Sequence, residues 1–237
     1  MKVTQFAVIV FTLFLAQLLM QSQNVMAQET RSHAGIALDS PWKQAIYQFA
    51  EEKLQHSAWG LEHYERNYLV ATELALRASL TIDQEVLFAA AFLHDMGTFE
   101  PYAIAGAEHS QTAVDNLTTV LIDAGFPSEK IAAVNTAVLA HMYYAEVPND
   151  TTAIVLHDAD TLDFLGLIGV ARILSLTSRH PWARDLKTAL ATLEGFSTQL
   201  PSTLRTDSAK EIGRTRVEEM LELLTTLRQE SFDGTTL

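Results

Sequence analysis

The sequence predicts an all-α protein, and three observations support this. Apolar residues recur at spacings of three and four through most of the chain after residue 41, as one buried face of a helix requires. No segment alternates apolar and polar residues as a half-buried strand does, and no repeat or glycine-rich phosphate loop is present. With 237 residues, 48% of them hydrophobic, the chain is long enough for one well-packed domain. We therefore expect a single helical-bundle domain over residues 41–230, with 231–237 as a tail.

The N-terminus has the pattern of a signal peptide over residues 1–27. Lys2 provides the positive charge, residues 3–20 are mostly apolar, and Val25-Met26-Ala27 places small residues where a signal peptidase cleaves. Cleavage after Ala27 predicts export to the periplasm or secretion, without stable membrane association afterwards. The alternative is a membrane anchor formed by residues 3–20, because that run approaches spanning length. Residues 28–40 show no pattern and are expected to be a flexible lead.

Three helices are expected in the first half of the domain. Ser40 is a candidate N-cap with Pro41 at the first helical position, and the apolar periodicity continues to Leu54. A second helix is expected over about 62–79. A third starts at Asp83, a plausible cap, and ends at the glycine at position 97. This third segment is apolar on all sides, which predicts a central, buried helix.

The second half shows the same periodicity, divided by glycine and proline. A helix from about residue 107 ends at the Gly125-Phe126-Pro127 turn, and the next is capped by Ser128 and runs to about Tyr144. A long apolar segment over 153–176 is interrupted by two glycines. Two further amphipathic helices are expected around residues 186–196 and over about 207–229, the last with its apolar face formed by Ile212, Val217, Met220, Leu221, Leu224 and Leu227.

Composition excludes several classes of function. Sixteen basic residues stand against 29 acidic ones, a formal net charge of −13, which argues against a nucleic-acid-binding protein. The chain has no cysteine, so disulfides, thiolate zinc sites and cysteine nucleophiles are excluded. Oligomeric state cannot be read from the sequence.

Histidine and aspartate side chains are expected on the apolar faces of five different helices. A single histidine on an apolar face is usually a satisfied core residue, but four of them together with carboxylates favour another explanation. Helical bundles build metal sites from inward-facing histidines and carboxylates, and an unpaired buried charge is costly. The candidate metal ligands are His63, His94, Asp95, His109, His141 and Asp160.

Three local motifs resemble those of the HD superfamily of metal-dependent phosphohydrolases. Glu62-His63-Tyr64-Glu65-Arg66 is similar to the family's first-histidine helix. Leu93-His94-Asp95-Met96-Gly97 resembles its signature, and Asp158-Ala159-Asp160-Thr161-Leu162-Asp163 its last motif. The resemblance covers residues 42–179. One departure is Thr98, because many members have lysine after the signature glycine.

The resemblance implies roles for particular residues. Four residues are expected to bind one divalent metal: His63, His94, Asp95 and Asp160. Two-metal members of the superfamily have extra histidines between the HD pair and the last aspartate. If this protein is such a member, Asp95 would bridge to a second ion held by His109 and His141. Alternatively, the last two histidines line the pocket and bind substrate. Candidates for catalytic or substrate-binding roles beyond the metal ligands are Arg66, Asp163 and Arg172, with Asp163 able to orient a ligand or move a proton.

The implied activity is hydrolysis of a small phosphate ester or nucleotide by a metal-activated water. An alternative is non-phosphate chemistry, either nitrile hydration, since the apolar run before His94 also resembles the cyanamide hydratase-like branch, or di-iron oxygenation. A third reading is a helical binding domain whose histidine–aspartate cluster is structural. Histidine and aspartate accept Mn, Fe, Co, Ni or Zn, so the metal and the choice between one and two ions stay open. Specificity is expected to lie in the loops over residues 98–108 and 145–150.

Overall fold

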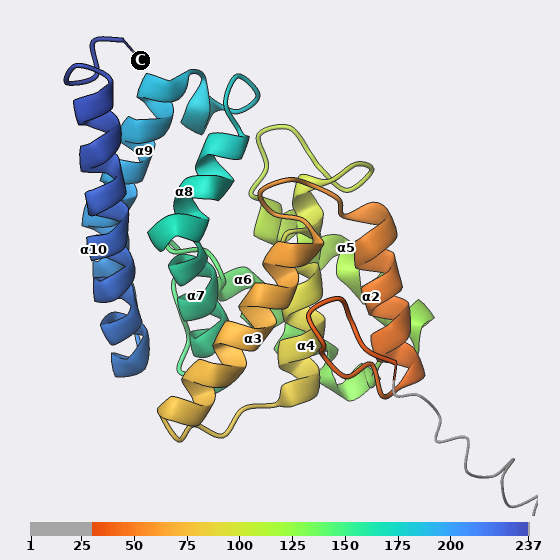
Figure 1. Cartoon of the computed structure of the whole chain (residues 1–237). Helices are drawn as coiled ribbons and strands as arrows, with labels where there is room; N and C mark the ends of the chain where they lie inside the picture. Colours follow the sequence, from red (N-terminus) through yellow and green to blue (C-terminus); the bar gives the residue numbers. More distant parts are fainter. Residues whose placement is uncertain (1–29, 237) are drawn as a thin grey trace, which may run out of the picture. The chain divides into compact units, whose positions relative to one another are not determined.

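The computed structural model describes residues 30–236, so the predicted signal peptide lies outside the described residues. The all-α prediction is confirmed, since the described part of the chain contains no named strand. Within residues 30–236, nine α-helices follow one another, with short 3-10 turns between some of them (Figure 1). Their bounds are α2 Pro41–Lys53, α3 Leu61–Arg77, α4 Gln84–Leu93, α5 His109–Ala124, α6 Ile131–Ala140, α7 Thr151–Asp163, α8 Gly166–Ser175, α9 Leu186–Gln199 and α10 Asp207–Glu230.

The described chain forms two compact units, residues 30–39 and residues 40–236. Residues 30–39, expected as part of a flexible lead, contain a hydrogen-bonded turn closed by an antiparallel bridge between Arg31 and Ala37. The Arg31 guanidinium donates to the carbonyl of Gly35 at 2.7 Å. None of the helices in residues 30–236 combines the length and hydropathy that crossing a bilayer requires.

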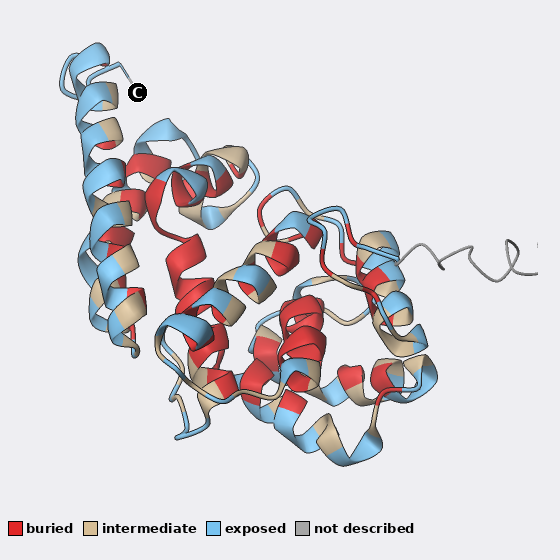
Figure 2. Cartoon of the chain, turned by 60° about the horizontal axis from the view of Figure 1, so that its bottom comes forward, coloured by how far each residue is buried: buried red, intermediate tan, exposed pale blue. Residues whose placement is uncertain are grey.

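Helix α4 is the centre of the helical unit. Every residue from Val86 to Leu93 is buried, as expected for a helix that is apolar all round. Helices α2, α3, α6 and α7 pack against it. Asp83 caps α4 as predicted, accepting hydrogen bonds from the backbone N–H groups of Glu85 and Val86. Figure 2 shows buried residues concentrated where the helices face one another, whereas the outer side of α10 is exposed.

Several predicted helix details differ from the structure. Ser128 starts a 3-10 turn and its side chain caps nothing; α6 begins at Ile131 and ends at Ala140, four residues before the expected Tyr144. Ser40 occupies the N-cap position of α2 without a side-chain hydrogen bond. On α10, Met220 and Leu224 are buried, but Leu221 is 43% exposed.

The long apolar segment after residue 153 is two helices rather than one. Gly166 has a φ of +72°, a left-handed conformation that glycine adopts without strain, and the chain turns there between α7 and α8. The turn leaves α7 packed on α3 and α8 packed on α9 and α10. The centre of the unit therefore collects the middle of α3 and α7, the C-terminal ends of α4 and α6, and the start of α5.

Candidate metal centre

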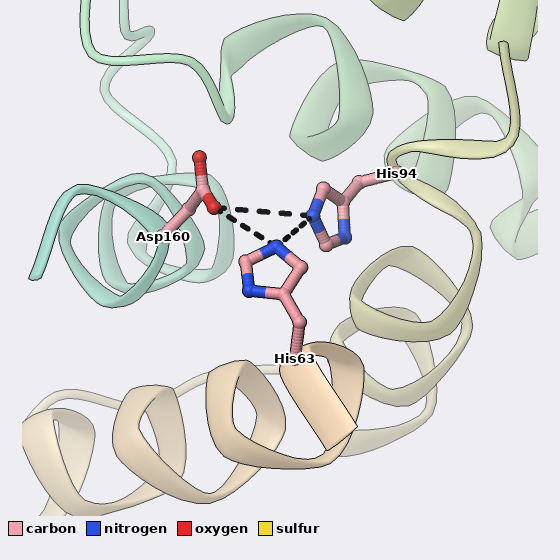
Figure 3. Close-up of side chains that lie close together, drawn as sticks. All are labelled: His63, His94 and Asp160. Atoms are coloured by element: carbon pink, nitrogen blue, oxygen red, sulfur yellow. Dashed lines mark hydrogen bonds and ion pairs between the residues drawn. The ribbon is translucent and has the colours of Figure 1, made fainter. Parts of the chain in front are cut away.

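Three side chains from α3, α4 and α7 converge at the centre of the unit (Figure 3). His63 Nε2 lies 3.1 Å from His94 Nε2 and 3.3 Å from Asp160 Oδ1, and His94 Nε2 lies 4.0 Å from the same oxygen. All three residues are almost completely buried. Ligand atoms about 2.0–2.1 Å from a tetrahedral ion lie about 3.3–3.4 Å apart, so these separations suit a shared ion.

Asp95 directs its two carboxylate oxygens toward two different groups. Its Oδ2 lies 3.5 Å from His63 Nε2 and 3.4 Å from His94 Nε2, which completes the first group. Its Oδ1 lies 3.5 Å from His109 Nε2 and 3.6 Å from His141 Nε2. The last two nitrogens are 3.2 Å apart. Asp95 therefore stands between two sets of histidine nitrogens.

The other ring nitrogen of each histidine is held by an oxygen. His94 Nδ1 faces the carbonyl of Ala91 at 3.0 Å, and His141 Nδ1 faces that of Val138 at 2.6 Å, each one turn back along the chain. His63 Nδ1 lies 2.7 Å from Asp163 Oδ2, and His109 Nδ1 lies 3.2 Å from Glu108 Oε1. These contacts place the N–H on Nδ1 and leave Nε2 as the inward lone pair, the arrangement found behind metal-bound histidines.

Asp163 organises two arginines behind His63. Arg66 approaches it with Nε at 2.8 Å from Oδ1 and a terminal nitrogen at 2.9 Å from Oδ2. Arg172 lies 3.0 Å from Oδ2 and donates through Nε to the carbonyl of Ala58 at 2.6 Å. Asp163 thus orients His63, one of the two roles predicted for it. Arg66 does not line the cavity described below, in contrast to its predicted substrate contact, because its guanidinium is turned to Asp163.

The centre carries strongly perturbed titratable groups. Burial and the Arg172 guanidinium oppose a proton on His63, but three carboxylate partners outweigh them and raise its pKa to about 9. Burial opposes the charge of Asp160, yet the bond and charge of His63 lower its pKa to about 2. The pKa of His94 is lowered, chiefly by burial. The ionised carboxylates of Asp95 and Asp160 thus converge on the lone pairs of the histidines. A cation or a proton is needed between these electron-rich groups.

The donor set is chemically suited to a divalent transition metal. Imidazole nitrogens and carboxylate oxygens together accept Mn, Fe, Co, Ni or Zn. Asn67, one turn after His63 on α3, directs its amide nitrogen to Asp160 Oδ1 at 3.3 Å and supports the carboxylate. The residues present therefore fit a metal, while their number leaves room for one ion or two.

A cavity of about 190 Å³ opens onto the centre. Asp95, His109, Asp160 and Arg172 line it, whereas His141 is fully buried and does not. The predicted substrate-binding roles of His109, His141 and Arg172 stay predictions. Thr98 lines the cavity too, with its hydroxyl donating to the carbonyl of Asp95 at 2.8 Å.

The remaining walls of the cavity come from residues that the sequence did not single out. They are Trp59, Met142, Tyr144, Phe164, His180 and Trp182. Of the two loops expected to set specificity, residues 98–108 contribute only Thr98 and residues 145–150 contribute nothing to the lining. The turn between α8 and α9 brings His180 and Trp182 to the cavity.

Comparison with known proteins places this centre in a family. Residues 60–165 match the sequence model of the HD domain. This segment contains the first histidine, the His94-Asp95 pair, both further histidines and the last aspartate. No curated protein matches the chain significantly.

Solved structures share the fold at low identity. YpgQ from Bacillus subtilis, solved with ADP, is 20% identical, with a TM-score of 0.61 over 79% of this chain and 97% of its own. A Lactobacillus plantarum protein is 22% identical, with a TM-score of 0.59 over 80% and 96% of the two chains. A protein described as a predicted HD superfamily hydrolase, from an uncultured Thermotogales bacterium, is also 22% identical, with a TM-score of 0.54 over 80% and 90% of the two chains.

Proposed function

We propose that the protein is a metal-dependent phosphohydrolase that cleaves a small phosphate ester. The observation that carries this proposal is the position of Asp95, whose two oxygens face two separate sets of histidine nitrogens. Two ions a few ångströms apart form a clamp for the attacking and leaving oxygens of a displacement at phosphorus. The HD-domain match over residues 60–165 and the fold shared with a predicted HD superfamily hydrolase support the same class, hydrolase.

Each residue of the centre has a proposed role. His63, His94 and Asp160 would hold a first ion, His109 and His141 would hold a second, and Asp95 would contribute an oxygen to each. A divalent ion bound here would lower the pKa of a water molecule and polarise the phosphoryl oxygen. Asp163 keeps the Nε2 lone pair of His63 directed inward, because it binds the Nδ1 side of the ring.

Arg172 is the positive side chain best placed to meet a phosphate. It lines the cavity and is buried, so its charge is little screened by water. It is anchored by Asp163 and by the carbonyl of Ala58, which holds the guanidinium ready without reorganisation. Arg66 has a positioning role in this proposal, acting on His63 through Asp163.

Non-phosphate chemistry is the second candidate function, and one observation favours it. Among the residues that line the cavity, Arg172 is the one arginine or lysine, and its charge is already balanced by Asp163. A neutral small molecule such as a nitrile would need no further cation, and the same ligand set would serve hydration or di-iron oxygenation. Phosphate release separates the two candidates directly.

The decisive experiment measures metal and phosphate together. The protein starting at Gln28 is loaded with Mn, Fe, Co, Ni or Zn in turn, its metal content is measured by elemental analysis, and phosphate release is measured from small esters. About two ions per chain, reduced to one in both His109→Ala and His141→Ala, is the expected result. His33→Ala, an exposed histidine outside the centre, is the matched control and should retain both ions.

Two results would contradict the proposal. One ion in the wild type that is unchanged in both histidine variants would make His109 and His141 pocket residues. A metal-loaded protein that releases no phosphate from any ester but converts a nitrile, or consumes O₂ with a visible iron absorption band, would establish the second candidate instead.

A further inference from the structure

The walls of the cavity above the metal centre are mainly aromatic, while its base is charged. Trp59, Phe164 and Trp182 come from three separate segments and all line the cavity, with the Trp182 ring in contact with the other two. Asp95, Asp160 and Arg172 line it too. The cavity therefore offers charged groups of the centre, where the chemistry would take place, together with aromatic rings that could contact the rest of a substrate.

We propose that the organic group of the substrate is a single planar, weakly polar ring, so that the natural substrate class is a compact aryl phosphate monoester. This inference rests on the proposed phosphohydrolase function and specifies its substrate. It assigns Trp59, Phe164 and Trp182 as the ring subsite.

The volume of the cavity supports a single ring. Pockets for drug-sized ligands occupy roughly 300–1,000 Å³, and an engineered apolar cavity of about 150 Å³ holds one benzene molecule. At about 190 Å³ the present cavity is close to the second value and below the first. A phosphate with one ring attached fills such a space, whereas a nucleotide has a base, a sugar and phosphate to accommodate.

The aromatic walls are held in place before any ligand binds. Trp59 stacks on His56 with centroids 4.0 Å apart and 14° between the planes. Trp182 meets Phe164 edge-on at 5.9 Å and Trp59 edge-on at 6.5 Å. Such edge-to-face contacts leave little rotational freedom, so a ring entering the site gains aromatic contacts with little ordering cost.

The polar atoms around the walls are partly engaged within the protein. The Tyr144 hydroxyl donates to Glu108 Oε1 at 3.1 Å, and His180 Nδ1 accepts the backbone N–H of Trp182 at 3.3 Å. Phe164 has its ring covered by the Arg172 guanidinium at 4.5 Å. The walls thus offer few groups to replace the water around sugar or glycerol hydroxyls, and they favour an apolar ring over a polyol.

The test compares esters that differ only in the organic group. Phosphate release from phenyl phosphate, glycerol 2-phosphate and adenosine monophosphate is measured in wild type and in Trp182→Ala. We expect kcat/KM for phenyl phosphate to exceed that for the other two at least tenfold. Removal of the indole should lower it at least tenfold, because a single methylene in an apolar pocket is already worth about 10–200-fold, and the loss for glycerol 2-phosphate should be smaller.

A binding measurement provides a readout independent of turnover. Phenylphosphonate, which cannot be hydrolysed as an ester, is titrated against the intrinsic tryptophan fluorescence of the protein. The change on binding should be lost in a protein with both Trp59→Phe and Trp182→Phe. It should persist in Trp42→Phe, because Trp42 packs on Phe88 and Phe126 away from the cavity.

The outcomes separate the ring subsite from the reaction. Equal hydrolysis of phenyl and glycerol esters, or faster hydrolysis of the nucleotide, would overturn the ring subsite and leave the phosphohydrolase proposal intact. No hydrolysis of any ester, with the phenylphosphonate response still dependent on Trp59 and Trp182, would overturn the phosphohydrolase proposal and support the ring subsite. A fluorescence response that survives the double variant would overturn the assignment of these tryptophans.

Discussion

The glycine of the Leu93-His94-Asp95-Met96-Gly97 motif is explained by a close backbone contact. A Cβ atom at Gly97 would lie 2.0 Å from the carbonyl oxygen of His109, 2.6 Å from Thr112 Oγ1 and 2.8 Å from the backbone nitrogen of Ala113. Ordinary contacts begin at 3.4 Å, so the first atom would have to move by about 1.4 Å, the difference between 3.4 Å and 2.0 Å. Two of the three atoms are backbone and cannot rotate away.

Gly97→Ala is therefore predicted to displace the start of α5 and the His109 it presents. Overpacking in a well-packed region costs about 1–3 kcal/mol of stability. His109 Nε2 lies 3.5 Å from Asp95 Oδ1, and a shift above 1 Å would break that contact. His63, His94 and Asp160 lie on α3, at the end of α4 and on α7, so we expect the variant to lose one bound ion and keep the other.

Gly195→Ala on α9 is the matched control. An added Cβ there meets only Gln199 Nε2, at an ordinary 3.7 Å, so the change should stabilise the helix by about 1 kcal/mol. Both variants are unfolded in urea after metal removal, and their metal content is measured by elemental analysis. Gly97→Ala with wild-type stability, or with both ions lost together, would refute the reasoning.

Four further predictions concern charge and metal. Asp163→Asn should cost about 3–5 kcal/mol in urea unfolding because it leaves buried Arg172 without its carboxylate; Asp207→Asn, an exposed acid, should change little, and equal effects would contradict this. Because the pKa of His63 is raised to about 9, the metal-free protein should keep the stability from that proton below pH 6.5 and lose it as pH rises through 9. Metal affinity, measured by chelator competition, should rise about tenfold per pH unit up to 9, and a flat profile would count against a protonated His63. Removing metal by chelation should lower the Tm, and adding it back should restore it; an unchanged Tm would mean that the centre binds no ion in the folded protein.

The core and the centre could be predicted from the sequence because both depend on local patterns. The apolar run before His94 identifies a buried helix from composition alone, and the structure buries all of it. His63, Asp95 and Asp160 stand in motifs whose residue order is distinctive. Their convergence in space follows once the helices pack, as the distances between their side chains show.

The cavity walls could not be predicted in the same way. Trp59, His180 and Trp182 lie in turns between helices, where hydrophobic periodicity carries no signal. The contact of Trp59 with His180 and Trp182 depends on the direction of α8, which leads to their turn. The direction of α8 is set in turn by the left-handed conformation of Gly166. By itself the sequence His180-Pro181-Trp182 predicts only a turn. Its relevance to function follows from its position beside the metal centre.

The three aspartates at the end of α7, Asp158, Asp160 and Asp163, have three different roles. The sequence alone does not distinguish these roles. Residues two apart on a helix are about 200° apart around the axis, whereas residues three apart share a face. Asp160 and Asp163 accordingly face the histidines, and Asp158 points elsewhere. It accepts the backbone N–H groups of Arg205 and Thr206 at 2.7 and 2.8 Å, just before α10.

Donors from other segments face each of these three buried acids, which explains how one helix carries them. Asp158 is stabilised by backbone and hydroxyl donors. Asp160 and Asp163 contact the two different ring nitrogens of His63, and Asn67 donates to Asp160 while two arginines pair with Asp163. A bound cation would therefore act chiefly on Asp95 and Asp160, the two acids that face the histidine lone pairs. Asp158 and Asp163 hold α10 and His63 in place whether or not metal is present, so the fold should survive metal loss while the chemistry does not.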